Sequence, residues 1–432
     1  MPADFNLRSK EYWQRLGWGL FVGLLSAIGS FIFIALMNLG QSLIWPDLTD
    51  WTPFSGPWVM VGIMTVAGFL VGLIHHFTSA SELDVFAALK VGYMEPKPVP
   101  ASLLASLVTL IGGFSLGPEV PTGMLAAGLG SRLSNWRKMD SESTRHNVIS
   151  GISAAYAGLF SSPYVVLMML LESVHVQSPA YYGTLLITGL AATVGFGLFY
   201  VLGGDSFSPL LGLISPPAYD LRLWHLGVGI VLGILAVPVG LLFPVMTKII
   251  SRLVAPLNRQ PVIRGTLGGL LLGLLAFALP ITLGLGTNEI VSVYQHASEI
   301  GVALLVVFAL AKLLALSGAL SFGFIGGPIF PLLFVGSTMG TAIHLLFPQL
   351  PLGLAVGCMM VAVPAAIVPI PLALGVLGIG IIGLSPTNAL PVILASLIAH
   401  ATALGLGLRG GGVKKVSSGK GGKQADAPEH MG

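Results

Sequence analysis

The stretch "GGFSLGPEVPTG", residues 112–123, places one carboxylate, Glu119, between two prolines inside a long apolar region. Glycine and proline interrupt a helix, and a broken helix at membrane depth is tolerated only where its free backbone groups line a cavity or bind something. An ionisable side chain inside a membrane segment is functional by default. The stretch therefore predicts a broken membrane helix with a functional acid at the break.

The composition of the whole chain agrees with a membrane setting for this stretch. Of the 432 residues, 54% are hydrophobic and only 9% are charged, whereas about a quarter of the residues in a soluble domain are charged. Apolar runs long enough to cross roughly 30 Å of hydrocarbon recur along the chain, and we count about ten to twelve of them. The short alternating strands typical of an outer-membrane barrel are missing from this pattern. The expected fold class is an all-α integral membrane protein.

Basic residues collect at the N-terminus, in residues 131–146, in residues 248–264 and in the C-terminal tail. Cytoplasmic loops carry an excess of Lys and Arg, so we expect both termini to be cytoplasmic. The net charge of +3 is spread over these segments and leaves no nucleic-acid footprint. The Gly- and Lys-rich tail cannot bury a core, so we expect it to be disordered, with no soluble C-terminal domain.

These patterns divide the chain into three parts. We expect a cytoplasmic N-terminus (residues 1–16), a transmembrane domain (17–407) made of two inverted halves (about 17–222 and 223–407), and a disordered cytoplasmic tail (408–432).

The evidence for two halves is a second interrupted stretch, "SFGFIGGPIFPLL" (321–333), at the corresponding place in the second half. In both stretches a Gly-rich turn meets a proline and then a new apolar helix, and proline suits the first turn of a helix. Each break offers free backbone N–H groups and the positive end of a helix dipole. Two such ends at one point would bind an anion, and partial charges would also let it leave. A doubled break of this kind is typical of an inverted-repeat transporter with a midplane site.

Glu119 fits this arrangement as a gate. A carboxylate at a helix N-terminus is stabilised by the same N–H groups, so it can occupy the place of the anion and leave when protonated. The alternative is an ordinary first-turn acid at the water interface. Lys312, the basic residue near the second break, is assigned only a weak part in the local potential.

Over about residues 17–407 the sequence resembles the CLC family of chloride channels and chloride/proton antiporters. "GPEVP" (117–121) is similar to the family's G-(K/R)-E-G-P stretch, and "GPIFP" (327–331) corresponds to its G-x-F-x-P stretch. "YVVLMMLLESV", after "SSP" (161–163), looks like the helix that carries two acids in the family. The resemblance is divergent, and no C-terminal CBS domains are expected. It implies a gating role for Glu119 and anion binding at Gly117, Pro118, Val120, Gly327, Pro328, Ile329 and Phe330.

The departures from the family pattern concern charge and proton transfer. Pro118 replaces the family's basic residue, and Val120 replaces its glycine. Ile329 stands at the phenylalanine position, with Phe330 one residue later. Of the two acids, Glu172 is kept, but the second, which relays the proton from the inside in the antiporters, is Ser173. A serine cannot titrate near neutral pH, so the proton pathway through these two residues is doubtful.

The family's first motif and its last helix are also altered. The first motif corresponds to "TSASELDVFAAL" (78–89), where Ser79, Ala80 and Ser81 are the candidates for anion binding. The same letters are a good helix N-cap followed by first-turn acids, which is an equally weighted alternative. The family's central tyrosine belongs to the last helix, and residues 388–412 contain none.

The function expected is permeation of a small monovalent anion, chloride above others, gated by Glu119 and channel-like or weakly proton-coupled. The alternative is a chloride/proton or fluoride/proton antiporter, with protons as a second partner. A remote alternative is a multi-pass membrane enzyme that uses Glu119 with Ser115 or Thr122, and another is an assembly subunit without transport. We expect no enzyme activity, cofactor, metal site or nucleic-acid partner. The resemblance implies a homodimer, embedded in lipid in a prokaryotic-type inner membrane.

Overall fold

The computed structural model of the protein describes residues 10–45, 58–173, 180–204, 210 and 212–407. These residues form helices and connecting turns without a β-strand. The first half contains α1 (Lys10–Ile44), α3 (Trp58–Phe77), α4 (Val85–Val91), α5 (Val99–Ile111), α6 (Glu119–Trp136), α7 (Ser141–Leu159), α8 (Pro163–Ser173) and α9 (Ala180–Gly203). The second half contains α10 (Leu223–Val254), η2 (Ala255–Arg259), α11 (Pro261–Ala278), η3 (Pro280–Thr282), α12 (Thr287–Gln295), α13 (Ala297–Phe322), α14 (Ile329–Leu346), α15 (Leu352–Ala365), α16 (Pro371–Ile382) and α17 (Ala389–Gly405).

The number and kind of helices agree with an integral membrane protein. Seven described helices are long and apolar enough to span a membrane, and five shorter apolar helices accompany them. Helix α1 already begins at Lys10, ahead of the apolar run expected from residue 17. The tail expected at 408–432 lies outside the described residues.

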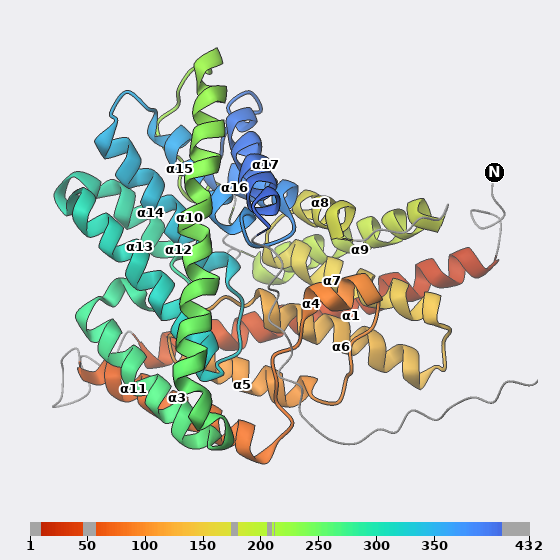
Figure 1. The fold of residues 1–432 in the computed structure, drawn as a ribbon. Coiled ribbons are helices and arrows are strands. Elements are labelled where there is room, and N and C mark those ends of the chain that lie inside the picture. The colour runs from red at the N-terminus through yellow and green to blue at the C-terminus, as the bar shows by residue number, and fades with distance from the viewer. Residues whose placement is uncertain (1–9, 46–57, 174–179, 205–209, 211, 408–432) are drawn as a thin grey trace, which may run out of the picture.

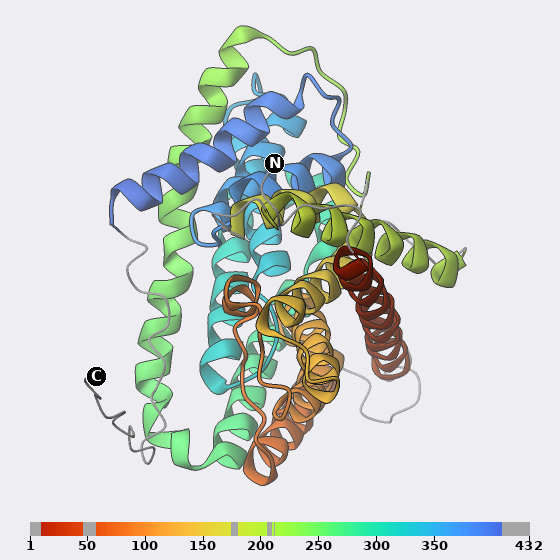
Figure 2. The ribbon, with the colours of Figure 1, turned by 90° about the vertical axis from the view of Figure 1, so that its right-hand side faces the viewer.

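The two halves lie beside each other, and each begins with a long helix (α1, α10) followed by an apolar helix of 20 or 18 residues (α3, α11). In Figure 1 most of the green to blue second half lies on the left and at the top and most of the red to yellow-green first half lies on the right, while α3 of the first half lies beside α11 at the lower left. Helices α6 and α14 each have 18 residues and each follow a Gly-rich break. The long helices that open the halves, α1 and α10, are strongly inclined to each other (Figure 2). The inverted-repeat architecture predicted from the breaks is thus the one observed.

Helices α3 and α11 join the halves through backbone-to-backbone packing. A side chain on Gly68 would collide with the carbonyl of Gly265, and one on Gly269 would collide with the carbonyl of Met64. Small residues allow membrane helices to approach this closely, because lipid supplies no hydrophobic drive for their association. The high glycine count of the chain therefore serves helix packing as well as the helix breaks.

Two of the basic segments lie on one face. Arg15 of α1 forms an ion pair of 2.8 Å with Glu142 in the first turn of α7. Asp140 caps α7 by accepting the N–H of Ser143 at 2.7 Å, and this hydrogen bond holds the pKa of the Asp140 carboxyl below its usual value. The N-terminal end of α1 and the segment 131–146 therefore share a side of the molecule, as their basic character predicts.

Candidate functional site

The two helix breaks meet directly. The backbone N–H of Gly117 donates to the carbonyl of Gly327 at 2.8 Å, and the N–H of Gly327 donates to the carbonyl of Gly117 at 2.8 Å. This pair of bonds brings the N-terminal ends of α6 and α14 together inside the protein. The fold predicted from sequence required the breaks to share one place, and they do.

The side chain of Glu119 crosses from the first break to the second. Its Oε1 accepts the backbone N–H of Ile329 at 2.7 Å, although the whole residue is only 2% exposed. Its Oε2 is buried and has no hydrogen-bond partner among the described residues. The carboxylate of one break thus occupies the anion-binding end of the helix that starts at the other.

Two glycines leave the room that this carboxylate needs. A Cβ added to Gly117 would overlap Oε2 of Glu119, and a Cβ added to Gly327 would overlap its carboxyl carbon and Oε1. Neither glycine has a positive φ, so the requirement is space and not backbone conformation. Glycine at 117 and 327 therefore shapes a cradle for a group of carboxylate size.

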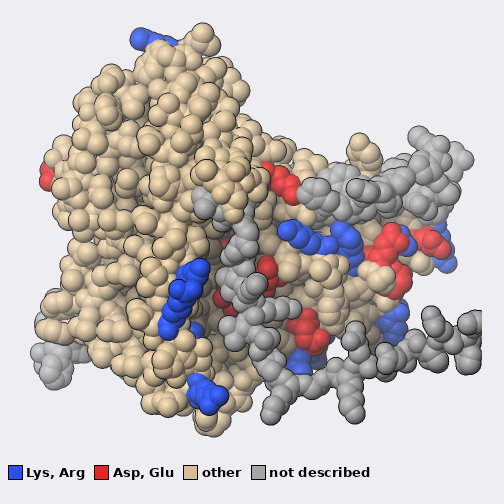
Figure 3. All heavy atoms as spheres, viewed as in Figure 1, with Lys and Arg blue, Asp and Glu red and all other residues tan. Residues whose placement is uncertain are grey.

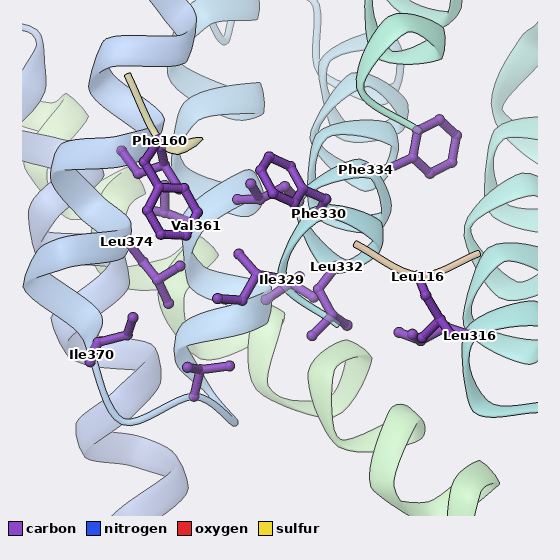
Figure 4. Packing of buried hydrophobic residues seen from close by; sticks show 14 of the residues in the cluster. Leu116, Phe160, Leu316, Ile329, Phe330, Leu332, Phe334, Val361, Ile370 and Leu374 are labelled. Carbon is purple, nitrogen blue, oxygen red and sulfur yellow. The ribbon is translucent and has the colours of Figure 1, made fainter. Parts of the chain in front are cut away.

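Apolar side chains surround the cradle. Leu116 and Phe330 are buried beside it, and the ring of Phe330 lies 6.0 Å from that of Phe160 between centroids, as Figure 4 shows. Next to the breaks, Phe114 stacks on Phe324 with their centroids 3.8 Å apart. An anion at this place would meet backbone dipoles in a low-dielectric wall, where electrostatic interactions are strong.

Tyr156 of α7 belongs to the site and was missed from the sequence. Its hydroxyl donates to the backbone carbonyl of Glu119 at 2.7 Å, and its ring fills the space beside Gly123. This contact fixes the first turn of α6. The available signal was a lone tyrosine among small residues, "SAAYAGL" (153–159), within a membrane helix.

The sequence assigned Lys312 only a weak part in the local potential, but in the structure its side chain anchors a loop. Its side chain is fully buried, and its Nζ donates to three backbone carbonyls, those of Ile281, Leu283 and Gly284, at 3.2, 2.8 and 2.9 Å. Three acceptors need three N–H donors, which only the ammonium form provides. The N–H of Gly284 in turn donates to the carbonyl of Gly113 at 2.9 Å. Lys312 therefore holds a loop that contacts the start of the first break.

Glu172 and Ser173 are neighbours in the chain but make different contacts. Both carboxylate oxygens of Glu172 accept backbone N–H groups at the start of α16, from Leu372 at 2.6 Å and Ala373 at 3.0 Å. Ser173 is buried, and its hydroxyl has no partner among the described residues. Glu172 thus caps α16, and a proton pathway through these residues stays a prediction.

The segment with Ser79, Ala80 and Ser81 forms the turn between α3 and α4. Ser79 and Ser81 are exposed, and the N–H and carbonyl of Ser81 both bond to the hydroxyl of Ser102. Asp84 is the N-cap of α4 and accepts the N–H of Ala87 at 2.9 Å. The segment thus contains a helix N-cap, as the alternative predicted, but the cap is Asp84 and the first turn of α4 contains no acid. None of the segment's hydrogen bonds given by the structure reaches Glu119, and anion binding at Ser79, Ala80 and Ser81 stays a prediction.

Comparison with known proteins assigns the chain to a family. The sequence model of the voltage-gated chloride channel family matches residues 66–404. The chain belongs to this chloride channel family. It is therefore a multi-pass membrane protein of a family that transports anions.

Two other proteins are similar to this chain over most of its length. A chloride/fluoride channel protein of Pseudomonas syringae pv. tomato is 27% identical over 406 residues, which cover 90% of this chain and 85% of the relative. The ion-transport protein YfeO of Salmonella paratyphi A is 26% identical over 356 residues, covering 78% and 82%.

Solved structures show the same fold. A slow cyanobacterial Cl⁻/H⁺ antiporter superposes with a TM-score of 0.77 at 22% identity, covering 91% of this chain and 95% of the other. A CLC-type fluoride/proton antiporter superposes with a TM-score of 0.74 at 22% identity, covering 91% and 97%. At this identity the likeness concerns the fold alone.

Proposed function

We propose that the protein conducts small monovalent anions, chloride above others, through the point where the two breaks meet, and that Glu119 gates this path. The observation that carries the proposal is the hydrogen bond from the N–H of Ile329 to the carboxylate of Glu119. A helix N-terminus that binds a carboxylate will also bind a halide of the same charge. The carboxylate and the permeating anion then compete for one place.

The competition supplies a gate that responds to protonation. The ionised carboxylate is held by the N–H of Ile329 and fills the cradle made by Gly117 and Gly327. Protonation removes its charge, so the attraction to the helix N-terminus falls and an anion can replace it. The cradle contains backbone dipoles, and within the described part of the chain no Lys or Arg side chain donates to Glu119, so an anion bound there can leave again.

Permeation is channel-like or only weakly coupled to protons in this proposal. Ser173 cannot replace a titrating acid, and Glu172 is engaged as the cap of α16. The second candidate is an anion/proton antiporter. It is favoured by the two structural neighbours, which are described as Cl⁻/H⁺ and fluoride/proton antiporters.

Transport is proposed in preference to enzyme activity. Thr122, one of the two hydroxyls considered as a second catalytic group, donates to the carbonyl of Pro118 at 2.7 Å, so it is engaged in its own helix turn. A homodimer in a prokaryotic inner membrane, with both termini cytoplasmic, completes the proposal and follows from the family resemblance and the basic segments.

The test is anion flux from liposomes that contain the purified protein, recorded from about pH 7.5 down to about pH 4.5. Wild-type flux should rise as the pH falls, and Glu119→Gln, which mimics the protonated acid, should give high flux that hardly depends on pH. Glu299→Gln, at an exposed acid of α13, is the matched control and should keep the wild-type profile. A Glu119→Gln protein with the wild-type profile would show that another group is the gate, and absence of flux would remove the transport proposal.

A further inference from the structure

A second site lies away from Glu119, where α3 ends, α11 begins and α13 turns towards the second break. A cavity of about 220 Å³ is lined there by His75, Asn258, Arg264, Phe322 and Gly323, with small residues of α3 and α11 completing the wall. None of these residues belongs to the Glu119 cradle. The cavity therefore needs an explanation of its own.

Arg264 brings a positive charge to this cavity without an acidic partner. One terminal nitrogen donates to the carbonyl of Ser321, and the buried Nε has no hydrogen-bond partner within the described part of the chain. The ion pair found in that part of the chain joins Arg15 to Glu142 and does not involve Arg264. A partly buried guanidinium with an unused N–H group is costly unless an acceptor reaches it.

His75 lines the cavity together with Arg264. Its Nδ1 lies 3.1 Å from the carbonyl oxygen of Ala80, and its Nε2 lies 2.9 Å from the carbonyl oxygen of Gly323. A carbonyl oxygen only accepts, so both contacts are attractive only when both ring nitrogens carry hydrogen. The ring of His75 is therefore held between the turn after α3 and the end of α13.

None of the residues that line the cavity is acidic. Helix α3, the 3-10 turn η2 and helix α11 contain no Asp or Glu. Glu82 and Asp84 follow in the turn after α3, where Asp84 is used to cap α4, and the acid of α13, Glu299, lies at its opposite end. Arg264 therefore charges the cavity positively, and no acid among the described residues pairs with it.

Exposed basic residues also lie on the segment of chain that leads to Asn258 and Arg264 of the cavity wall. Lys248, Arg252 and Arg259, at the end of α10 and in η2, are exposed. Figure 3 shows Lys and Arg side chains without acidic ones over the lower end of α10. Basic pockets between membrane helices on the cytoplasmic side suit the head groups of anionic lipids.

We propose that this cavity binds a phosphate group, carried by an anionic lipid head group or free in the cytoplasm. The planar guanidinium of Arg264 matches a phosphate by a two-point contact, and His75 forms the wall beside it. The volume lies below the roughly 300–1,000 Å³ of sites for drug-sized ligands, which suits one head group better than a nucleotide. This binding site is independent of the gating role of Glu119.

An occupant would sit against the start of the second break. Gly323 ends α13 with a φ of 92°, and its carbonyl is the acceptor of His75. Residues 324–328 then lead directly into α14. A phosphate held by Arg264 therefore lies against the residues that lead into α14, the helix that begins at Ile329. Its binding stabilises the folded protein by mass action.

The experiment measures the melting temperature of the full-length protein in a neutral detergent while dihexanoyl phosphatidylglycerol, dihexanoyl phosphatidylcholine or inorganic phosphate is added at constant ionic strength. Phosphatidylglycerol or phosphate should raise the melting temperature of the wild type in a saturable way. Arg264→Gln should weaken the apparent affinity about tenfold, the range expected for a charge-assisted contact. Arg132→Gln, at an exposed arginine of α6 that does not line the cavity, is the matched control and should change the apparent affinity less than about twofold.

The arms of the experiment separate the two sources of phosphate. A shift with inorganic phosphate assigns a free anion, and a shift with phosphatidylglycerol alone assigns a lipid head group. Arg264→Lys keeps the charge but loses the two-point contact, and His75→Gln removes the imidazole ring from the cavity wall. Each of these variants should weaken binding, and they replace Arg264→Gln if that variant does not fold. The proposal is overturned if neither phosphate compound shifts the melting temperature, if phosphatidylcholine shifts it equally, or if folded cavity variants bind like the wild type.

Discussion

The carboxylate of Glu119 accepts the backbone N–H of Ile329 at 2.7 Å, across a separation of 210 residues. Each residue lies in the first turn of a helix that begins at a break. The acid of the first half therefore lies at the positive, N-terminal end of helix α14 in the second half. The hydrogen bond explains how a carboxylate can be buried inside a membrane protein, because the helix N-terminus stabilises its charge while the apolar wall keeps water away. It also makes the acid replaceable by another anion.

Gly327→Ala should uncouple flux from pH. The added methyl group would overlap the carboxyl of Glu119, so the acid could no longer seat on Ile329. We expect the ratio of flux at about pH 4.5 to flux at about pH 7.5 to fall to within about twofold of one, measured in liposomes.

The control for this variant is Gly62→Ala, because an added Cβ at Gly62 meets no atom within 4 Å. It should keep the wild-type ratio of fluxes. A Gly327→Ala protein that folds and retains the full pH response would contradict the seating of the carboxylate in this cradle.

Glu172→Ala should destabilise the protein through helix α16. The carboxylate accepts two N–H groups that otherwise have no partner at the start of that helix, and loss of an N-terminal cap costs about 0.5–2 kcal/mol. We expect a lower melting temperature in detergent, with Glu172→Gln between Ala and the wild type because an amide oxygen still accepts. Glu299→Ala is the control; equal melting temperatures for all variants would show that the cap contributes nothing.

A chloride gradient should drive no measurable uphill proton movement in liposomes. Ser173 is buried and cannot titrate near neutral pH, so a proton released by Glu119 has no acid at the position used by the antiporters of the family. Ser173→Glu tests whether an acid there is enough to create coupling. Proton pumping at a fixed stoichiometry by the unmodified protein would favour the antiporter alternative.

Lys312→Met should strongly reduce stability. The change leaves three buried carbonyls without their donor, and an unsatisfied buried group costs about 1–3 kcal/mol. The loop that contacts Gly113 should loosen, so we also expect lower flux in the fraction that folds. Lys90→Met, at an exposed lysine of α4, is the control; similar melting temperatures for the two variants would refute the anchoring role of Lys312.

The sequence alone determined the membrane setting, the helical fold and the two breaks. Hydropathy and the Gly-Pro stretches at 112–123 and 321–333 act over short distances along the chain, because they decide whether a segment prefers lipid and whether its helix can continue. The same local logic singled out Glu119, since an acid inside an apolar helix is costly without a function. The apolar pattern did not predict where α1 starts. This helix begins before its apolar run, because charged and polar residues continue the helix beyond the hydrocarbon.

Only the tertiary structure decided which groups meet. The mutual bonds of Gly117 and Gly327, the hydroxyl of Tyr156 on the carbonyl of Glu119 and the three carbonyls around Lys312 join segments that are distant in the chain. The physical reason is that backbone carbonyl and N–H groups are chemically the same in almost every residue. The sequence therefore does not predict which of them will form a hydrogen bond with a given buried side chain. Packing of the two halves selects these partners, because every buried polar group must find one where the helices come to rest.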